Sequence, residues 1–366
     1  MTAARFVTGS TMTHVVVMTL TGALGLMAMF MVDLVDLFFL SLLNRTDVTA
    51  AIGYAGTIVF TNLSVSIGIG IAAAALVATN LGAGRPERAR EFATSSLLFS
   101  LIVSAVITLV IASGSGQLLS LLGAEGEARR LAQVFIWTLT PGYVLLTGAV
   151  CCSFILRGLG DPRRAMYITL SAAVFTALVD PLFIFGFGWG IQGAAAANVF
   201  GYAVSLGIGL HGVVRVHRFI HPMRLAALRR DLPAIRAIAV PAVLTQLATP
   251  FSNAYITYEV APFGDAAVAA SAIIGRLVPV AFGIIFALSG SVGPIIGQNF
   301  GARKFDRVVQ TLKDGLLFSA VYTLLMSSLL FLFRHQIAEA FRASGRTIDI
   351  VVFFCTFIAI SWAFAG

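Results

Sequence analysis

"NLGAGRPERAREFATSSLLFS" (residues 80–100) aligns without gaps on "NFGARKFDRVVQTLKDGLLFS" (residues 299–319), at an offset of 219 residues. The two copies share the opening asparagine, the glycine two residues later, an arginine eight residues in and the closing "LLFS". Each copy follows the second apolar segment of its half of the chain. Parallel copies of a helical unit with an even number of crossings predict two lobes related by an axis along the membrane normal.

The composition around this repeat is that of a membrane protein. The chain has 366 residues, of which 58% are hydrophobic and 11% charged, and its mean hydropathy is +0.95. Apolar runs of roughly 20 residues or more, each long enough to cross a bilayer, fill most of it. Strands of a barrel would show ten-residue alternation instead, so the sequence predicts an all-α polytopic protein.

The apolar runs predict ten helices and three regions. The expected helices span residues 12–43, 49–81, 91–122, 128–156, 165–187, 190–214, 235–262, 266–299, 307–333 and 347–366. The expected N-terminal lobe is 1–214, with six helices, and the expected C-terminal lobe is 237–366, with four. A basic cytoplasmic linker at 215–236 would separate the lobes. The chain then ends inside its tenth helix, which would leave a second six-helix lobe incomplete.

The distribution of basic residues predicts the topology. Seventeen Lys and Arg residues fall on the side of the N-terminus and the linker, and six fall on the opposite side. Because positive loops stay inside, we expect a cytoplasmic N-terminus and a multi-pass protein of the bacterial inner membrane. The net charge of +8 then reflects topology and contact with the lipid bilayer, and no soluble basic domain favours nucleic acid as a partner.

Acidic residues occur where the sequence should be buried in the membrane. "MFMVDLVDLFFLSLL" (residues 29–43) places Asp33 and Asp36 on one face of the first helix. Asp180 lies in "TALVDPLFIFGFG", directly before Pro181, which should interrupt helical hydrogen bonding there. A charged Asp at bilayer depth costs at least about 2.5 to 3.5 kcal/mol, so such residues point to function.

Two carboxylates brought close in a medium of low dielectric constant cannot both stay ionised cheaply. They are expected to share a proton or to hold a cation such as sodium, which prefers oxygen ligands. The alternative is a structural pairing with an arginine, for which Arg276 is the only candidate at membrane depth. One such cation could not neutralise all three acids.

Four blocks of the sequence resemble one transporter family. They are "MVDLVDLFFLSLLNRTDVTAAIGYAG" (31–56), "LRGLGDPRRAM" (156–166), "ALVDPLFIFGFGWGIQGAAAANV" (177–199) and "GQNFGARKFDRV" (297–308). In these blocks the chain is similar to the multidrug and toxic compound extrusion (MATE) transporters, over nearly its whole length. The resemblance implies twelve helices in two lobes, which export cationic or amphipathic drugs against an inward flow of protons or sodium.

The resemblance also implies a cation site in the N-terminal lobe. Its residues fall on Asp36, Thr176, Asp180 and Asn198, where the family's asparagine and threonine are exchanged, and sodium would lie at Asp36 and Asp180. Asp33, Met29 and Phe39 are candidate residues for lining the cavity.

The function expected from these patterns is cation-coupled antiport by a monomer, without cofactors and without enzymatic activity. No catalytic triad, metal cluster or nucleotide motif is present in the sequence, and Cys151, Cys152 and Cys355 lie in apolar runs. Two alternatives stay open. One is a flippase for lipid-linked oligosaccharides from the same wider superfamily, and the other is a truncated homologue that does not transport.

Overall fold

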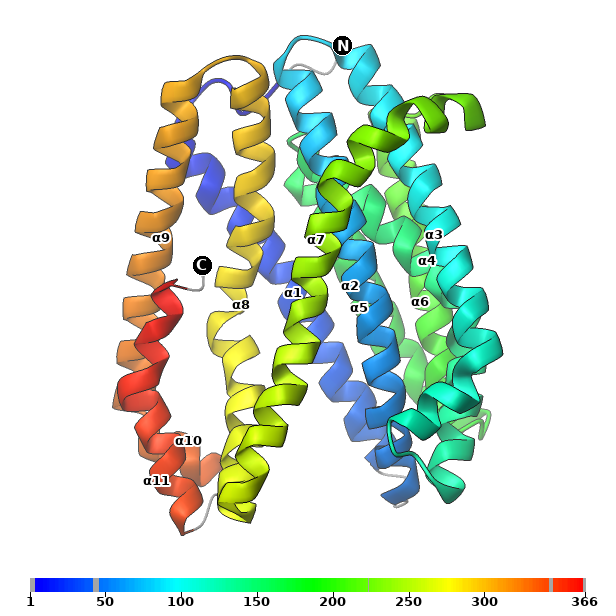
Figure 1. Cartoon of the computed structure of the whole chain (residues 1–366), viewed down its shortest axis with the longest axis vertical. Coiled ribbons are helices and arrows are strands. Elements are labelled where there is room, and N and C mark those ends of the chain that lie inside the picture. Colours follow the sequence, from blue (N-terminus) through cyan, green and yellow to red (C-terminus); the bar gives the residue numbers. More distant parts are fainter. Residues whose placement is uncertain (1–3, 42–45, 223, 342–344, 365–366) are drawn as a thin grey trace.

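The computed structural model describes residues 4–41, 46–222, 224–341 and 345–364, and this part of the chain is helical without strands (Figure 1). The helices are α1 (Thr11–Ser41), α2 (Thr46–Gly82), α3 (Pro86–Leu121), α4 (Gly126–Gly158), α5 (Pro162–Pro181), α6 (Ile191–Leu210), α7 (Leu225–Val260), α8 (Asp265–Gly301), α9 (Phe305–Leu332), α10 (Arg334–Ala340) and α11 (Arg346–Phe353). Nine helical segments of the described chain are long and apolar enough to cross a membrane. The all-α prediction is therefore confirmed.

The observed helices differ from the predicted ones in three places. The expected helix 347–366 is α-helical only over α11 and continues as a π-helical turn, Phe354–Ile358, and a 3₁₀ helix, Ala359–Phe364. α10 is a seven-residue helix that the sequence did not reveal, because it is shorter than any spanning segment. α7 begins at Leu225 rather than near residue 235, so the second half of the basic stretch 215–236 is helical. Leucine, alanine and arginine, which favour helix, are frequent there, although the segment is too polar to look like a membrane span. The predicted interruption at Pro181 is present, since α5 ends at this residue and continues as a π-helical turn, Leu182–Gly186.

Contacts between the two halves of the chain follow the sequence repeat. A Cβ atom added to Gly82 would lie 1.9 Å from the carbonyl oxygen of Gln298, and one added to Gly301 would lie 2.0 Å from the carbonyl oxygen of Thr79. Gln298 and Gly301 occupy the positions of Thr79 and Gly82 at the repeat offset of 219, so the two contacts are reciprocal. This is the pattern that a twofold axis produces, and the axis passes between α2 and α8.

The arginines shared by the two repeats also exchange partners across this axis. Arg88 of α3 forms an ion pair with Asp231 near the start of α7, at 2.7 Å. Arg307 of α9 donates hydrogen bonds to the carbonyl oxygens of Phe6, Thr8 and Gly9, which precede α1. Each arginine thus holds the beginning of the other half of the chain.

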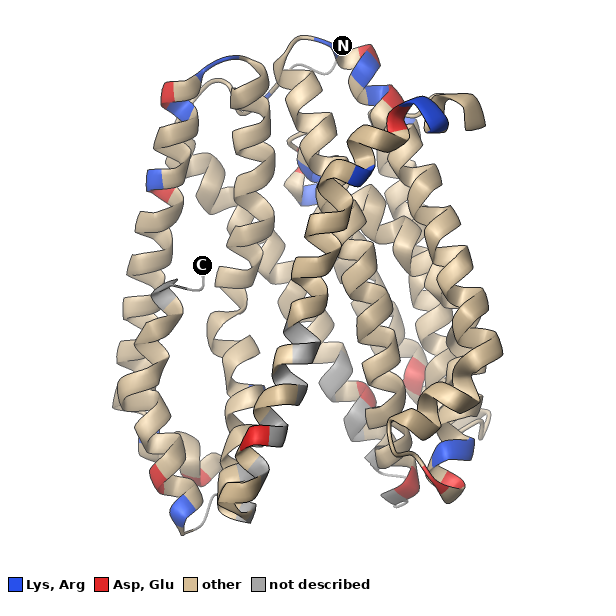
Figure 2. Cartoon of the chain, viewed as in Figure 1, with Lys and Arg blue, Asp and Glu red and all other residues tan. Residues whose placement is uncertain are grey.

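We call the end of the molecule that carries these contacts the basic end. It contains the N-terminus and the connections α2–α3, α4–α5 and α8–α9, and most of the coloured Lys and Arg residues in Figure 2 lie there. Gln298 is fully buried at this end, where its side chain accepts from the Phe6 amide (2.9 Å) and donates to the Gly158 carbonyl (2.8 Å). The N-terminal segment and both halves of the chain therefore meet at one glutamine.

The two halves diverge away from the basic end. In Figure 1 the ribbons of α7 and α8 separate from those of α1 and α2 toward the lower end of the view. Glycines in this region have open surroundings, since a Cβ atom on Gly53 or Gly56 of α2, or on Gly275 or Gly283 of α8, would meet nothing within 4 Å. The structure is thus closed at the basic end and spread at the opposite end.

Substitution of Gly301 with alanine should open the basic end. The added Cβ atom would overlap the Thr79 backbone, which cannot rotate away, so the two halves must move apart. Spin labels at positions 87 and 306, which are equivalent in the repeat, should report a longer distance in Gly301→Ala than in the parent protein. Gly53→Ala, where there is room for a Cβ atom, should leave this distance unchanged. An unaltered distance in Gly301→Ala would contradict the close contact.

Loss of the Asp231 carboxylate should destabilise the fold. Asp231 is fully buried, and it binds Arg88, Arg230 (3.0 Å) and the Ser95 hydroxyl (2.7 Å). Asp231→Ala leaves these donors without their shared acceptor and should lower the free energy of unfolding by about 1 to 3 kcal/mol. Glu87→Ala removes an exposed acid of the same region and should cost at most about 1 kcal/mol. Thermal unfolding of the purified variants measures both, and equal losses would refute the assignment.

Candidate functional site

Three helices bring the predicted cation-site residues together away from the basic end. Asp36 lies near the end of α1, Asp180 in the last turn of α5 and Asn198 in the second turn of α6. Asn198 donates a hydrogen bond from Nδ2 to Oδ2 of Asp36, at 3.1 Å, and the same amide nitrogen also donates to the Ala194 carbonyl at 3.1 Å. α1 packs against α5, and the Asp180 carboxyl group lies close enough to the Asp36 carboxyl group for the two to interact. The two acids therefore share one site.

The carboxyl groups carry free acceptor capacity. Asp180 is 0% exposed, and neither of its carboxyl oxygens accepts a hydrogen bond from a donor in the described residues. Asp36 is half-buried, and its Oδ1 likewise has no donor there. Buried carboxyl oxygens are costly to leave unsatisfied, so the pair is suited to bind something positive.

Thr176 lies one helical turn before Asp180 on the same face of α5. Its side chain is 2% exposed and packs against Gly201 of α6, where an added Cβ atom would lie 2.4 Å from the Thr176 hydroxyl oxygen. Gly201 follows Asn198 by three residues, so both face α5 from the same side of α6. A glycine at this position lets the hydroxyl of α5 approach α6 beside the acids.

A pairing of the acids with arginine is not observed. Within the described chain no Lys or Arg forms an ion pair with Asp36 or Asp180, and Arg276 is exposed on α8. The described residues also contain no cluster of three or more His, Cys, Asp or Glu that would hold a transition metal. The arrangement is instead a pair of carboxyl groups with one hydroxyl and one amide nearby, which suits a proton or a hard cation.

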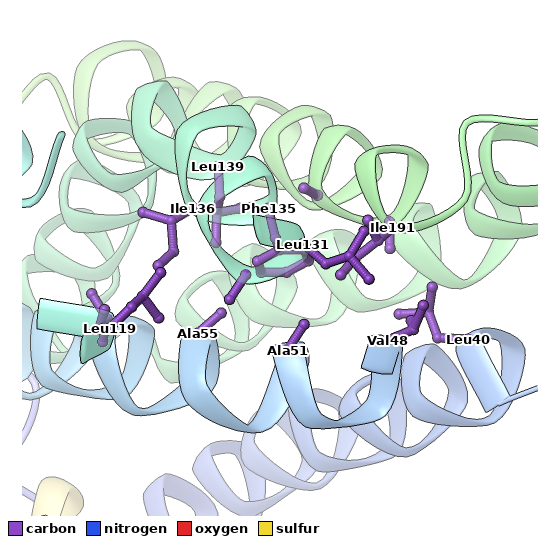
Figure 3. Close-up of a cluster of buried hydrophobic side chains, with 14 of the residues drawn as sticks. Leu40, Val48, Ala51, Ala55, Leu119, Leu131, Phe135, Ile136, Leu139 and Ile191 are labelled. Atoms are coloured by element: carbon purple, nitrogen blue, oxygen red, sulfur yellow. The ribbon is translucent and has the colours of Figure 1, made fainter. Parts of the chain in front are cut away.

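An apolar cluster, part of which is drawn in Figure 3, includes residues of α1 and α6, two of the helices that carry the site. Its buried residues come from the ends of α1 and α3, the first half of α4 and the starts of α2 and α6, all away from the basic end, and Ile184, four residues after Asp180, belongs to it. The cluster fixes the ends of the helices that carry the polar groups. Rigid packing of this kind holds site residues in place.

The candidate cavity-lining residues are less well placed. Phe39 packs against the same apolar cluster and meets Phe185 edge to face, with 6.2 Å between ring centroids. Met29 is half-buried on α1, and the side chain of Asp33 lies outside the described residues. A cavity-lining role for the three stays a prediction.

Asp231 shows what the sequence did not reveal. It stands beside two arginines in a polar stretch, which is typical of a solvated face, yet the structure buries it completely between α7 and α3. A similar anchor fixes α5, whose N-cap Asp161 accepts hydrogen bonds from His217 (2.9 Å) and Arg164. Burial by itself would raise the pKa of Asp161, but these hydrogen bonds outweigh it and hold the pKa well below its usual range.

Comparison with known proteins places this architecture. The family model described as MatE matches residues 22–182 and 241–366. The chain is 30% identical over 343 residues to the "FAD transporter" of Shewanella oneidensis, covering 92% of this chain and 76% of that protein. It is 23% identical over 338 residues to the "Multidrug export protein MepA" of Staphylococcus aureus, covering 90% and 73%.

Solved structures agree with the fold. The bent form of the Vibrio cholerae MATE transporter VcmN is 25% identical and superimposes with a TM-score of 0.90, covering 96% of this chain and 80% of that one. A MOP superfamily transporter from Pyrococcus furiosus, whose binding pocket is described as having reverse polarity, superimposes with a TM-score of 0.90 at 22% identity, covering 99% and 81%. The matched family model, the Shewanella relative and the helical repeat agree, and the chain belongs to the MatE family of multi-pass membrane transporters.

Proposed function

We propose that the chain is a cation-coupled antiporter that exports cationic or amphipathic compounds by alternating access. The observation that carries the proposal is the contact between Asp36 and the fully buried Asp180, without a basic partner in the described chain. The name of the Staphylococcus relative states multidrug export, which agrees with export as the direction of transport. The two acids would bind the coupling ion.

Proton and sodium are the two forms of coupling that the site supports. A proton shared between the carboxyl groups removes one of two like charges. Sodium would take oxygen ligands from Asp36, Asp180, Thr176 and the side-chain carbonyl of Asn198. Either cation would bind from the outside and be released into the cytoplasm.

α1 can transmit the state of this site to the second half of the chain. It packs against both α5 and α8. An added Cβ atom on Gly25 would lie 2.3 Å from the Thr169 hydroxyl of α5, and one on Gly22 would lie 3.5 Å from Ala287 of α8. A shift of α1 when the cation binds would therefore change how the two halves meet. α1 would then have two positions, and binding of the ion would favour one of them.

The proposed cycle follows from the closed basic end. With the N-terminus and this end in the cytoplasm of a bacterial cell, the structure corresponds to the state open to the outside. Drug would leave from this state as the cation binds, and release of the cation inside would reset the transporter. The transporter would work as a monomer in the inner membrane.

A second substrate class is supported by a specific observation. The Shewanella relative is named a FAD transporter, and FAD carries a negatively charged diphosphate. In this chain Arg157 has no ion-pair partner in the described residues and stands at the junction of the two halves. Export of an organic anion would still be driven by a cation bound at Asp36 and Asp180.

Removal of either acid should abolish coupled transport. Asp36→Asn and Asp180→Asn keep the shape of the side chains but remove the charge that holds the cation. In proteoliposomes loaded with ethidium, an imposed sodium or proton gradient should drive efflux by the parent protein at least about tenfold faster than by either variant. Asp47→Asn changes an exposed acid at the start of α2 and should retain the parent rate. Parent rates in both site variants would remove the proposed mechanism, and the gradient that drives efflux identifies the ion.

Crowding of Thr176 should weaken coupling without unfolding the protein. In Gly201→Ala the new methyl group would lie 2.4 Å from the Thr176 hydroxyl oxygen, which must rotate out of its position against α6, one turn before Asp180. The concentration of the driving cation needed for half-maximal efflux should rise several-fold. Gly207→Ala on the same helix meets nothing within 4 Å and should behave as the parent protein. The same cation dependence in both variants would exclude Thr176 from the site.

A further inference from the structure

Arg157 occupies an unusual position in the last turn of α4. Although its helix belongs to the first half of the chain, its guanidinium group reaches the second half. An added Cβ atom on Gly290 of α8 would lie 3.2 Å from Arg157 Nη1, and one on Gly22 of α1 would lie 3.8 Å from the same atom. Glycine at both positions leaves room for the guanidinium group between α1, α4 and α8.

The charge of Arg157 is not neutralised in the described chain. No carboxylate of this part of the chain lies within ion-pair distance, and no hydrogen bond from its guanidinium group is found. The Phe154 ring is nearby, with its centroid 5.4 Å from the guanidinium carbon. Arg88, Arg164 and Arg230, in contrast, each bind an acid. An arginine held away from acids but still half-buried is suited to receive an anion from outside the chain.

Two buried hydroxyl groups lie on the stretches of α1 and α8 that flank Arg157. Ser291 of α8 is fully buried, and its Oγ would lie 3.6 Å from a Cβ atom on Gly22. Thr19 lies one turn before Gly22 on the same face of α1, is 0% exposed, and its hydroxyl has no hydrogen-bond partner in the described residues. Within the described chain, the guanidinium group and the Thr19 hydroxyl offer free hydrogen-bond donors, while the Ser291 hydroxyl donates to the Ala287 carbonyl (2.7 Å) and would have to turn toward a ligand. Donors of this kind bind phosphate oxygens.

We propose that Arg157, assisted by Thr19 and Ser291, binds the phosphate or diphosphate group of an organic anion where the two halves meet. The inference rests on the proposed function as an exporter and names a second substrate class for it. The phosphate site is separate from the cation site, because Arg157 lies at the basic end and Asp36 and Asp180 lie toward the opposite end. One chain can thus hold a coupling cation and an anionic substrate without their charges cancelling.

Binding to the full chain in nanodiscs of phosphatidylcholine tests the proposal. The probes are FAD, which carries a diphosphate, riboflavin, which shares its flavin ring without phosphate, and ethidium, which is a cation. Arg157→Gln should weaken FAD binding by about tenfold or more, because a charged hydrogen-bond donor is lost. Riboflavin binding should not change, and ethidium should bind as tightly as before or more tightly. Arg157→Lys keeps the charge and should retain part of the affinity for FAD.

The matched control is Arg276→Gln, which removes a positive charge from an exposed position on α8. It should leave the binding of all three probes unchanged. Unchanged FAD affinity in Arg157→Gln would overturn the proposal. A parallel loss of affinity for all three probes, together with a lower melting temperature, would also overturn it, because Arg157 would then be structural.

Two further arms separate related explanations. Nanodiscs containing phosphatidylglycerol reveal whether a lipid phosphate takes the site. Competition of phosphatidylglycerol with FAD in the parent protein but not in Arg157→Gln would support the phosphate site and identify lipid as a second source of the ligand.

Failure of this inference is also distinct from failure of the proposed function. If Asp36→Asn abolishes ethidium transport while Arg157→Gln binds FAD normally, only the anion site is wrong. If Asp36→Asn transports normally, the coupling mechanism is wrong whatever Arg157 binds.

Discussion

The contact between Asp36 and Asp180 is the constraint on which the remaining structure depends. Two carboxyl groups meet inside a helical bundle, one of them fully buried, and the described chain supplies no cation beside them. Such a pair is expensive when both groups are ionised, so its charge must be balanced by something that arrives and leaves. The Asn198 amide donates to Asp36, Thr176 packs between α5 and α6, and the apolar cluster packs the ends of the helices, but none of these groups neutralises the acids. The free energy of such a site therefore differs between the form with a bound cation and the form without one.

The repeat residues join the two halves of the chain at the basic end. Its glycines, Gly82 and Gly301, bring the backbones of α2 and α8 into contact at the basic end, and its arginines hold the start of the opposite half. Contacts of this type join two bodies at one end and leave them free to separate at the other. α1 connects the two functions, because it carries Asp36 at one end and packs on α8 at the other.

Arg157 stands where the two halves meet and could bind substrate there. The polar contacts at the basic end largely join donors and acceptors of the chain itself, as at Gln298 and Asp231. Arg157 stands at the same junction with its charge available, and a bound phosphate there would touch both halves at once. Substrate recognition and the closing of the basic end would then share the same residues.

Much of this could be predicted from the sequence because it depends on local pattern. Apolar runs predicted most of the helices, the repeat predicted their parallel relation, and Pro181 predicted the interruption that ends α5. The acids in apolar runs predicted a candidate site at Asp36 and Asp180. The start of α7 and the short α10 escaped, since neither is apolar or long enough to resemble a span. By itself the sequence determined most of the helical residues and which polar groups stand in apolar runs. Only the tertiary structure decided which helix faces meet, and so that Asp36 contacts Asn198, that Asp231 is buried and that Arg157 is left without an acid. Those pairings join residues far apart in the chain, and helix packing, unlike helical periodicity, is not written in the spacing of neighbouring residues.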